Sequence, residues 1–393
     1  MQVLSKAAYH GARRRIAEVC ETSNDTMSLR VRILEQIQAV VGFDAYAWLM
    51  TDPQTCVGHS PLADFPQSPD LPRLIRLKYL TELNRWTTIT TPPVARLDAA
   101  TGGDLALSLL WRDLLRQYQV VDVASTVFKD RFGCWGFLDL WRSGSAPTFD
   151  EDEAAFLADI AADVTTALRS GQAKNFVVAS SGDARRIGPV VLLLSPDLTV
   201  LGQTPETERY LRTLVPSPTD RSPIPATAYN VGAQLLAVEA GADHHLPVAR
   251  MHLGDGTWVT VRAARISDTS QQHDRNIAIT IEAIAPSERL AVFALISGLS
   301  PRETELLEHL ATGSDTRNVA KQMLLSEHTV QDHLKSIFAK TSRTTDAPCS
   351  RERSAAELRT RSSAVAAARP RRGHGLPKHS MNVHQLTAPA DVG

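Results

Sequence analysis

The chain has 393 residues, 43% of them hydrophobic and 22% charged, so it is long enough for two or three domains that each bury a core. No apolar run approaches the roughly 18 residues that a membrane-spanning helix needs. The basic residues near the start are not followed by the apolar stretch of a signal peptide. We therefore expect a cytoplasmic protein that has no membrane partner.

The net charge of −1 conceals a gradient along the chain. Residues 1–298 carry 28 Lys and Arg against 33 Asp and Glu, whereas residues 346–393 carry 8 against 4. Positive charge near the C-terminus favours an anionic partner such as nucleic acid at that end. The four cysteines form no C-x-x-C pair, so their spacing predicts neither a zinc site nor a disulfide framework.

The first part of the chain alternates between helical and extended patterns. Apolar residues at helical spacing predict three helices, over 28–42, over 104–118 and from Asp150 onward. Runs rich in aromatic and apolar residues predict three strands, over 45–50, 120–128 and 132–141. This order resembles a GAF-type sensor domain over residues 25–170. The resemblance implies an antiparallel sheet with helices on its faces, often around a pocket.

A second unit follows a polar stretch. A strand over 190–194, a turn at Ser195–Asp197, a short strand and a helix resemble the opening of a PAS domain, and the unit closes on two or three more strands. We predict a PAS-like domain over residues 188–285. GAF and PAS domains are relatives in architecture.

Two groups of side chains in these domains permit more than one interpretation. The aromatic residues of the predicted strands could line a ligand pocket or pack in the core: Phe132, Trp135, Phe137 and Trp141. Asp139 lies among them in a strand that reads as buried. A second group could suggest a metal site, but its members lack helical i, i+4 spacing, so we favour solvated histidines: Asp243, His244, His245 and His252.

The most informative segment is 298–342, where three helices are predicted with clear boundaries. Ser300 is placed to cap the first helix, Pro301 takes its first position, and Glu303 completes a capping box. Gly313 lies where a left-handed C-terminal cap is needed. Asp315 can cap a second helix that runs through Met323.

Ser326 can cap the third helix, which has two distinct faces. Advancing 100° per residue places an apolar set on one side: Val330, Leu334, Ile337 and Phe338. The opposite side carries a polar set that could enter a major groove: His328, Gln331, Asp332, Lys335 and Ala339. A solvated helix face would look the same, and only the ordered motif distinguishes the two interpretations.

That motif resembles the LuxR-type DNA-binding domain. Its elements are the Leu-Ser-Pro-Arg-Glu opening at 299–303, Ala320, and the later Leu-Ser-x-x-Thr-Val-x-x-His-x-x-x-Ile-x-x-Lys pattern. The resemblance implies base contacts by Gln331, Asp332 and Lys335. It implies phosphate contacts by a second set: Ser326, Thr329, His333 and Lys340.

The family pattern stops near residue 345. LuxR-type domains have a fourth helix, whereas residues 346–393 are rich in Ala, Arg, Ser and Pro with few large apolar residues, which predicts a disordered basic tail. Without the fourth helix we expect partial exposure of Ile337 and Phe338. This departure leaves an alternative open, in which the chain is a sensor or interaction module that no longer binds DNA specifically.

Together these patterns predict a multi-domain protein, with α+β sensor domains followed by an all-α helix-turn-helix domain over 294–345. We expect a transcriptional regulator that binds double-stranded DNA as a homodimer and responds to a small-molecule or protein signal. No phosphate-binding loop, receiver-type acidic pair or nucleophile–base motif is found, so we expect neither an enzyme nor a catalytic residue, and we predict no cofactor or metal.

Overall fold

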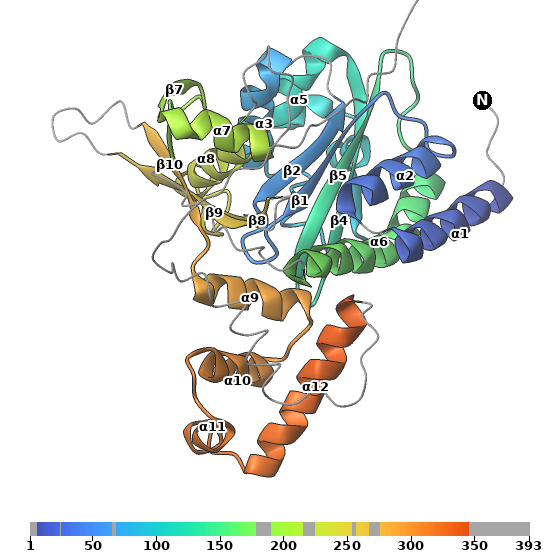
Figure 1. Ribbon diagram of the computed structural model, residues 1–393. Coiled ribbons are helices and arrows are strands. Elements are labelled where there is room, and N and C mark those ends of the chain that lie inside the picture. Colours follow the sequence, from blue (N-terminus) through green and yellow to red (C-terminus); the bar gives the residue numbers. More distant parts are fainter. Residues whose placement is uncertain are drawn as a thin grey trace, which may run out of the picture.

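The computed structural model describes residues 6–23, 25–64, 68–177, 190–214, 225–253, 257–266 and 276–345. These residues form a body of two β-sheets with their helices, and a smaller all-helical unit that hangs from one end of this body (Figure 1). A single helix, α9 (Pro286–Ile296), connects the two parts. The predicted tail over 346–393 lies outside the described residues.

The first domain contains the longest helix and a five-stranded sheet. Its elements in chain order are α1 (Lys6–Thr22), α2 (Thr26–Gln38), β1 (Ala45–Thr51), β2 (Gly58–Asp64), η1 (Ser68–Asp70), α3 (Leu71–Leu80), β3 (Val94–Arg96), α4 (Leu97–Thr101), η2 (Leu105–Leu107), α5 (Leu109–Asp113), η3 (Leu115–Tyr118), β4 (Val120–Asp130), β5 (Gly133–Ser143) and α6 (Glu151–Val177).

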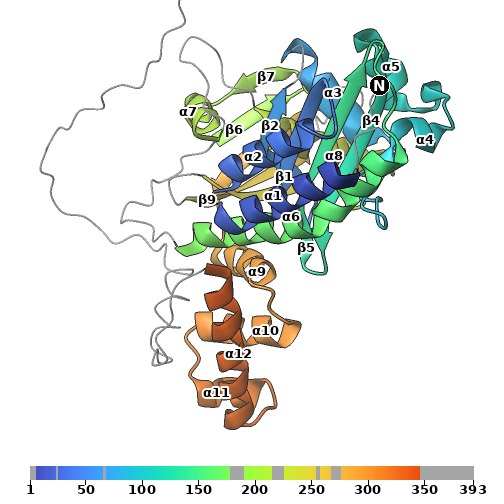
Figure 2. The same ribbon diagram turned by 90° about the vertical axis from the view of Figure 1, so that its right-hand side faces the viewer.

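The first sheet is antiparallel, with the strand order β2-β1-β5-β4-β3. Alternate residues of a strand face opposite sides of the sheet. Leu138 and Leu140 of β5 accordingly pack with apolar residues of α1, α2 and α6. Phe137 packs with residues of α3, and Trp141 packs with residues of α3 and α5. The sheet is therefore covered on both faces, and Figure 2 shows α1, α2 and α6 lying together over one of them.

A β-bulge interrupts the alternation near the start of β5. Phe128 pairs with Gly136, whereas Lys129 pairs with Cys134, so Trp135 is the extra residue. A bulge reverses which side the following side chains face. Trp135 therefore joins Leu138 in the core under α6, while Phe137 faces the other side. Trp135 thus packs in the core on one face of the sheet, whereas Phe137 and Trp141 lie on the opposite face.

The segment 104–118, expected as one helix, is broken into the short elements η2, α5 and η3. The side chain of Asp104 accepts a hydrogen bond from the amide of Ala106, and Ser108 caps α5 through the amide of Trp111. Side chains of this kind satisfy amides locally and so start a new turn instead of continuing the helix. Leu114, with φ −139°, then ends α5.

The second domain repeats the same sheet topology. Its elements are β6 (Val190–Leu194), β7 (Val200–Gln203), α7 (Pro205–Leu214), α8 (Ala226–Glu239), β8 (Val248–His252), β9 (Trp258–Arg265) and β10 (Ile277–Ala283). The strand order is β7-β6-β10-β9-β8. In both sheets the first strand lies between the second and the fifth, and the third lies at an edge. The two domains are therefore relatives in architecture.

Helix α8 lies between the two sheets (Figure 1). It is buried along most of its length, as expected for a helix that is apolar on nearly all sides. Residues of both domains share one hydrophobic cluster, which includes Tyr79 and Phe137 from the first and Val231 and Ile279 from the second. The two sheet domains therefore form one packed body instead of two units on a tether.

Buried ion pairs cross the same boundary. The Asp52 carboxylate accepts hydrogen bonds from Arg250 Nε and Nη2, both at 2.7 Å, and the Asp52 residue is fully buried. Arg85 Nη2 lies 2.6 Å from Asp243 Oδ2, with both side chains at most 2% exposed. Charges at such depth are stable only when paired with good geometry, so these contacts specify how the two domains meet.

The C-terminal helical domain consists of α10 (Pro301–Ala311), α11 (Thr316–Gln322) and α12 (Glu327–Thr345). The expected fold class is confirmed: two antiparallel sheets with helices precede an all-helical domain. Within the described part of the chain, no helix has the length and apolar character needed to cross a membrane.

Candidate nucleic-acid interface

The helices of the C-terminal domain begin where the sequence predicts. Ser300 Oγ accepts from the amide of Glu303, and Glu303 accepts in return from the amide of Ser300, which completes the capping box. Gly313 follows the C-terminal end of α10 and has φ +93°, a left-handed conformation that suits glycine. Asp315 caps α11 through the amide of Asn318.

The connection from α11 to α12 is tight. Leu324 has φ +55° and is 91% exposed, while Leu325 packs against the domain core. Ser326 Oγ then accepts from the amide of Thr329 at 3.1 Å and so begins α12. This turn sets the angle at which α12 leaves α11, which defines the helix-turn-helix arrangement.

One face of α12 holds the domain together. Val330 and Ile337 are fully buried and Leu334 nearly so, together with residues of α10 and α11. Phe338 is half-buried against the same cluster. The expectation that Ile337 would be partly exposed is wrong. Ile337 is instead enclosed in a cluster that α10 and α11 form with α12, and Leu290 and Ala294 of α9 belong to the same cluster.

The opposite face of α12 is exposed and polar. Gln331 and Asp332, which are consecutive, and Lys335, one turn further on, are exposed residues of this face. Lys335 Nζ donates to Asp332 Oδ1 at 3.0 Å, and His328 Nε2 lies 3.5 Å from Asp332 Oδ2. The Lys335 ammonium, followed by the His328 charge, holds the pKa of Asp332 below its ordinary value.

The four residues expected near phosphates are not equivalent in the structure. Ser326 is exposed, Thr329 is half-buried, and their hydroxyl oxygens lie 2.8 Å apart at the start of α12. His333 is half-buried on the next turn. Lys340 lies further along, where its Nζ is 2.6 Å from Glu303 Oε2. Ser326 and Thr329 thus lie together at the start of α12 and His333 lies beside its core face, whereas Lys340 pairs with Glu303 of α10.

Sequence reasoning missed this second role of Glu303. Besides capping α10, its carboxylate accepts from Ser336 Oγ at 2.7 Å and from Lys340. The i, i+4 spacing of Ser336 and Lys340 places both on one side of α12 and could have indicated a shared partner. The capping-box pattern already accounts for Glu303 at the start of α10, so the spacing of Ser336 and Lys340 alone does not identify Glu303 as their partner.

The orientation of α12 leaves its first turns clear of the sheet domains. Figure 1 shows its C-terminal end near α6 and its N-terminal end directed away from the body. Gln331, Asp332 and Lys335 belong to the N-terminal half. The surface that they form therefore remains accessible while the rest of the domain is docked.

The alternative metal cluster has a different composition from the one expected. Asp243, His244 and His245 lie together, with their candidate ligand atoms within 4.8 Å of one another. The Asp243 carboxylate, however, is already neutralised by Arg85 and accepts from His245 Nδ1 at 2.6 Å. His244 is 92% exposed. A carboxylate that is shared with an arginine is a poor cation ligand, so we assign this cluster to the domain boundary.

The capped helices, the tight turn and the exposed third helix define a helix-turn-helix DNA-binding domain. Residues 297–344 match the family model described as bacterial regulatory proteins, luxR family. The C-terminal part of the chain is therefore a LuxR-family helix-turn-helix domain, which marks the protein as a DNA-binding transcriptional regulator.

Comparisons of the whole chain are less specific. No curated protein matches it. Among solved structures, Escherichia coli SdiA aligns with a TM-score of 0.31 and 11% identity, over 91% of this chain and 98% of its own. A bacteriophytochrome from the photosynthetic bacterium R. palustris aligns with a TM-score of 0.32 and 12% identity, over 72% of this chain and 64% of its own.

Proposed function

We propose that the chain is a signal-responsive regulator that binds a two-fold operator as a homodimer and reads base pairs through α12. The observation that carries this proposal is the exposed polar face of that helix, where Gln331, Asp332 and Lys335 stand on the side opposite the core. A helix with one packed face and one polar face fits a major groove about 12 Å wide.

The proposed contacts follow from the chemistry of each side chain. Gln331 can pair bidentately with adenine, and Lys335 can donate to guanine. Asp332 holds Lys335 in place in the free protein and can accept from the amino group of cytosine. At the start of the helix, Ser326, Thr329 and the free amides there would bind phosphate, joined by His333 on the next turn.

Lys340 has a modified role in this proposal. It was expected to contact phosphate, but its ammonium neutralises Glu303 at 2.6 Å. Leaving Glu303 buried and unpaired would cost free energy. We therefore assign Lys340 to holding α12 against α10, and only indirectly to DNA binding.

The signal is proposed to act through α9. Its Leu290 and Ala294 pack with the DNA-binding domain, whereas Val292 and Ile296 pack with the cluster that contains α6. A ligand shifts an equilibrium by its differential affinity for the two states. A signal that favours one arrangement of the sheet domains would therefore change the packing of α9, and through α9 the position of the DNA-binding domain.

The test is DNA binding by the full-length protein to its own upstream region across a salt series. We expect salt-sensitive, sequence-dependent binding that falls at least about tenfold in the Gln331→Ala/Lys335→Ala variant. Arg302→Ala is the matched control, because it also removes one exposed positive charge from the domain but lies on α10. The control should retain specific binding.

The runner-up is a sensor or interaction module without specific DNA binding. It would take the lead if wild-type protein bound the upstream region no better than unrelated DNA, or if the double variant and the Arg302→Ala control bound equally well. Loss of binding in both variants would indicate a general charge effect and would also count against base reading by α12.

A further inference from the structure

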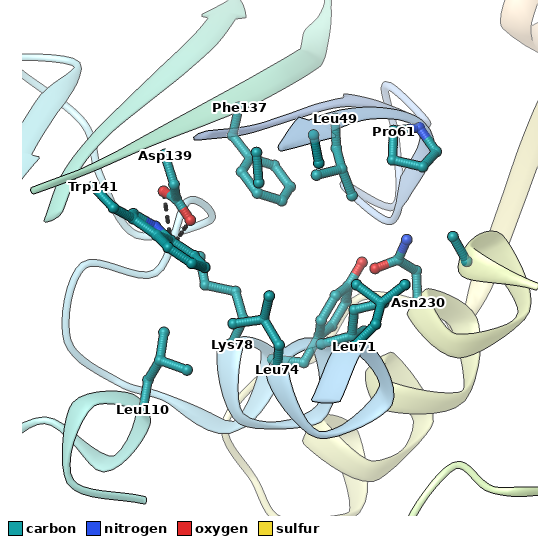
Figure 3. Close-up of a pocket in the computed structure, with 15 residues that line it drawn as sticks. Leu49, Pro61, Leu71, Leu74, Lys78, Leu110, Phe137, Asp139, Trp141 and Asn230 are labelled. Atoms are coloured by element: carbon teal, nitrogen blue, oxygen red, sulfur yellow. Dashed lines mark hydrogen bonds and ion pairs between the residues drawn. The ribbon is translucent and has the colours of Figure 1, made fainter. Parts of the chain in front are cut away.

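A cavity of about 280 Å³ lies between the first sheet, α3, α5 and the start of α8. Its walls are mainly apolar, with Leu49, Leu74, Leu110, Phe137 and Trp141 among them (Figure 3). A cavity of roughly 150 Å³ with such walls is large enough for benzene. The space here can therefore accept an aromatic ring or a short alkyl chain together with a small polar group.

One side of the cavity carries a buried ion pair. Lys78 Nζ lies 2.8 Å from Asp139 Oδ2, and Ser125 Oγ donates to Asp139 Oδ1 at 2.7 Å. The Lys78 and Asp139 side chains are 10% and 6% exposed. The pair is neutral as a whole, and its partners satisfy each other. A charged ligand would leave its own charge uncompensated in this low-dielectric space, so the site favours an uncharged molecule.

The other side carries an unsatisfied donor. Asn230 of α8 is 1% exposed and lines the cavity, and its Nδ2 has no hydrogen-bond partner. Figure 3 places its amide across the cavity from Asp139 and Trp141. Buried polar groups normally find partners, and an orphaned amide donor at a cavity wall calls for an acceptor in that cavity.

We infer that this cavity binds a small, uncharged and largely apolar molecule with a carbonyl-type acceptor, which accepts a hydrogen bond from Asn230 Nδ2. Asn230 belongs to the second domain, whereas the apolar walls named above belong to the first. The ligand therefore contacts both sheet domains at once. This inference rests on the proposed function in one respect, because it supplies the signal to which the regulator responds.

The experiment compares two probes that differ only in the acceptor: butyrophenone, which has a carbonyl, and butylbenzene, which has a methylene in its place. Binding to the full-length protein is measured by titration calorimetry in the absence of DNA. We expect butyrophenone to bind about tenfold more tightly, because its carbonyl satisfies a buried donor. The anion 4-phenylbutyrate, of similar size, should bind more weakly than butyrophenone.

Two variants assign the site. Asn230→Leu keeps the approximate volume and removes the donor, so the preference for butyrophenone should disappear while butylbenzene still binds. Leu74→Trp fills the cavity and should abolish binding of both probes. Failure of butyrophenone to bind, equal binding of the two probes by the wild type, or a preference retained in Asn230→Leu would overturn the inference. The wild-type comparison remains decisive if a variant does not fold.

These outcomes are separable from the proposed function. Specific binding of upstream DNA without probe binding leaves the regulator in place and removes this ligand site. Probe binding without specific DNA binding supports the cavity and contradicts the regulator.

Discussion

Glu303 Oε2 lies 2.6 Å from Lys340 Nζ and thereby joins the first helix of the DNA-binding domain to the last described turns of the third. The same carboxylate accepts from the Ser300 amide and from Ser336 Oγ. Burial alone would raise its pKa, but the hydrogen bonds from Lys340, Ser300 and Ser336 outweigh burial and lower it from 4.5 to about 2. One side chain thus caps α10 and anchors α12.

The first prediction concerns the pH dependence of this anchor. Because the folded-state pKa of Glu303 is depressed, its stabilisation is complete above about pH 4.5 and is lost as the pH falls toward 2. Glu303→Gln should lower the opening free energy of α10 and α12 by about 2 kcal/mol at pH 7. It should also flatten the pH dependence below pH 4.5. Hydrogen exchange of the amides of both helices, corrected for intrinsic rates, measures this free energy.

Glu305→Gln is the control for that experiment, since Glu305 lies on the same helix and its exposed carboxylate pairs with Arg302 at 2.9 Å. An exposed pair of this kind contributes less than about 1 kcal/mol. Equal effects of the two substitutions would mean that Glu303 is not an anchor.

The second prediction concerns the boundary between the sheet domains. Arg250→Met leaves the Asp52 carboxylate buried without its counter-charge, which should lower the free energy of unfolding by about 3–5 kcal/mol. Adding Asp52→Asn should recover part of this loss. Arg76→Met is the control, because its partner Asp197 is 82% exposed at 4.0 Å. Thermal unfolding of the full chain distinguishes them, and a similar melting shift for both arginine variants would contradict the assignment.

The third prediction tests the core face of α12. Ile337→Ala removes a fully buried side chain and should destabilise the helical domain by about 2–5 kcal/mol. DNA affinity should fall with it, since α12 loses its support. Leu324→Ala should change stability by less than about 0.5 kcal/mol, because Leu324 is 91% exposed. Urea titrations monitored by hydrogen exchange of α12 would settle the comparison, and a mild effect of Ile337→Ala would mean that Ile337 is not part of a closed core.

The fourth prediction concerns Gly298, at the joint between α9 and α10. Its φ is +66°, and a Cβ there would lie 3.0 Å from Phe132 Cζ of the first domain. Gly298→Ala should therefore lower the free energy of unfolding more than Gly102→Ala does. At Gly102 φ is +60°, and no atom would lie within 4 Å of the added Cβ. Left-handed backbone costs alanine about 1 kcal/mol at both positions. The difference in destabilisation between the two variants, measured by differential scanning calorimetry, reports the contact with Phe132. Equal destabilisation would mean that residue 298 does not pack against Phe132 in solution.

Much of the C-terminal domain was predictable because its signals are local. Caps at Ser300, Asp315 and Ser326 each accept from the amide three positions further on, so local sequence order specifies them. The two faces of α12 follow from helical periodicity in the same way. The prediction of one helix over 104–118 was wrong for a related reason. The apolar pattern there is that of a single helix, but caps at Asp104 and Ser108 start new turns and break it.

Contacts between segments that are distant in the sequence could not be predicted from local patterns. The pairing of Asp52 with Arg250, and the position of Asn230 beside a cavity of the other domain, depend on how two sheets meet through α8. No periodicity encodes that arrangement. The role of Lys340 was assigned from a motif that describes a bound complex, whereas its partner Glu303 becomes evident only when α10 and α12 are packed.

Helix α9 has a geometric consequence for the operator. Only Ile284 and Ala285 separate it from β10, and its apolar residues are divided between two cores. A short connection that is packed on both sides behaves as a strut and not as a flexible linker. In the proposed homodimer, the distance between the two recognition helices would then be set by the width of the sheet body. Operators whose half-sites are moved apart by a few base pairs should lose affinity steeply, because no slack in the chain can follow them.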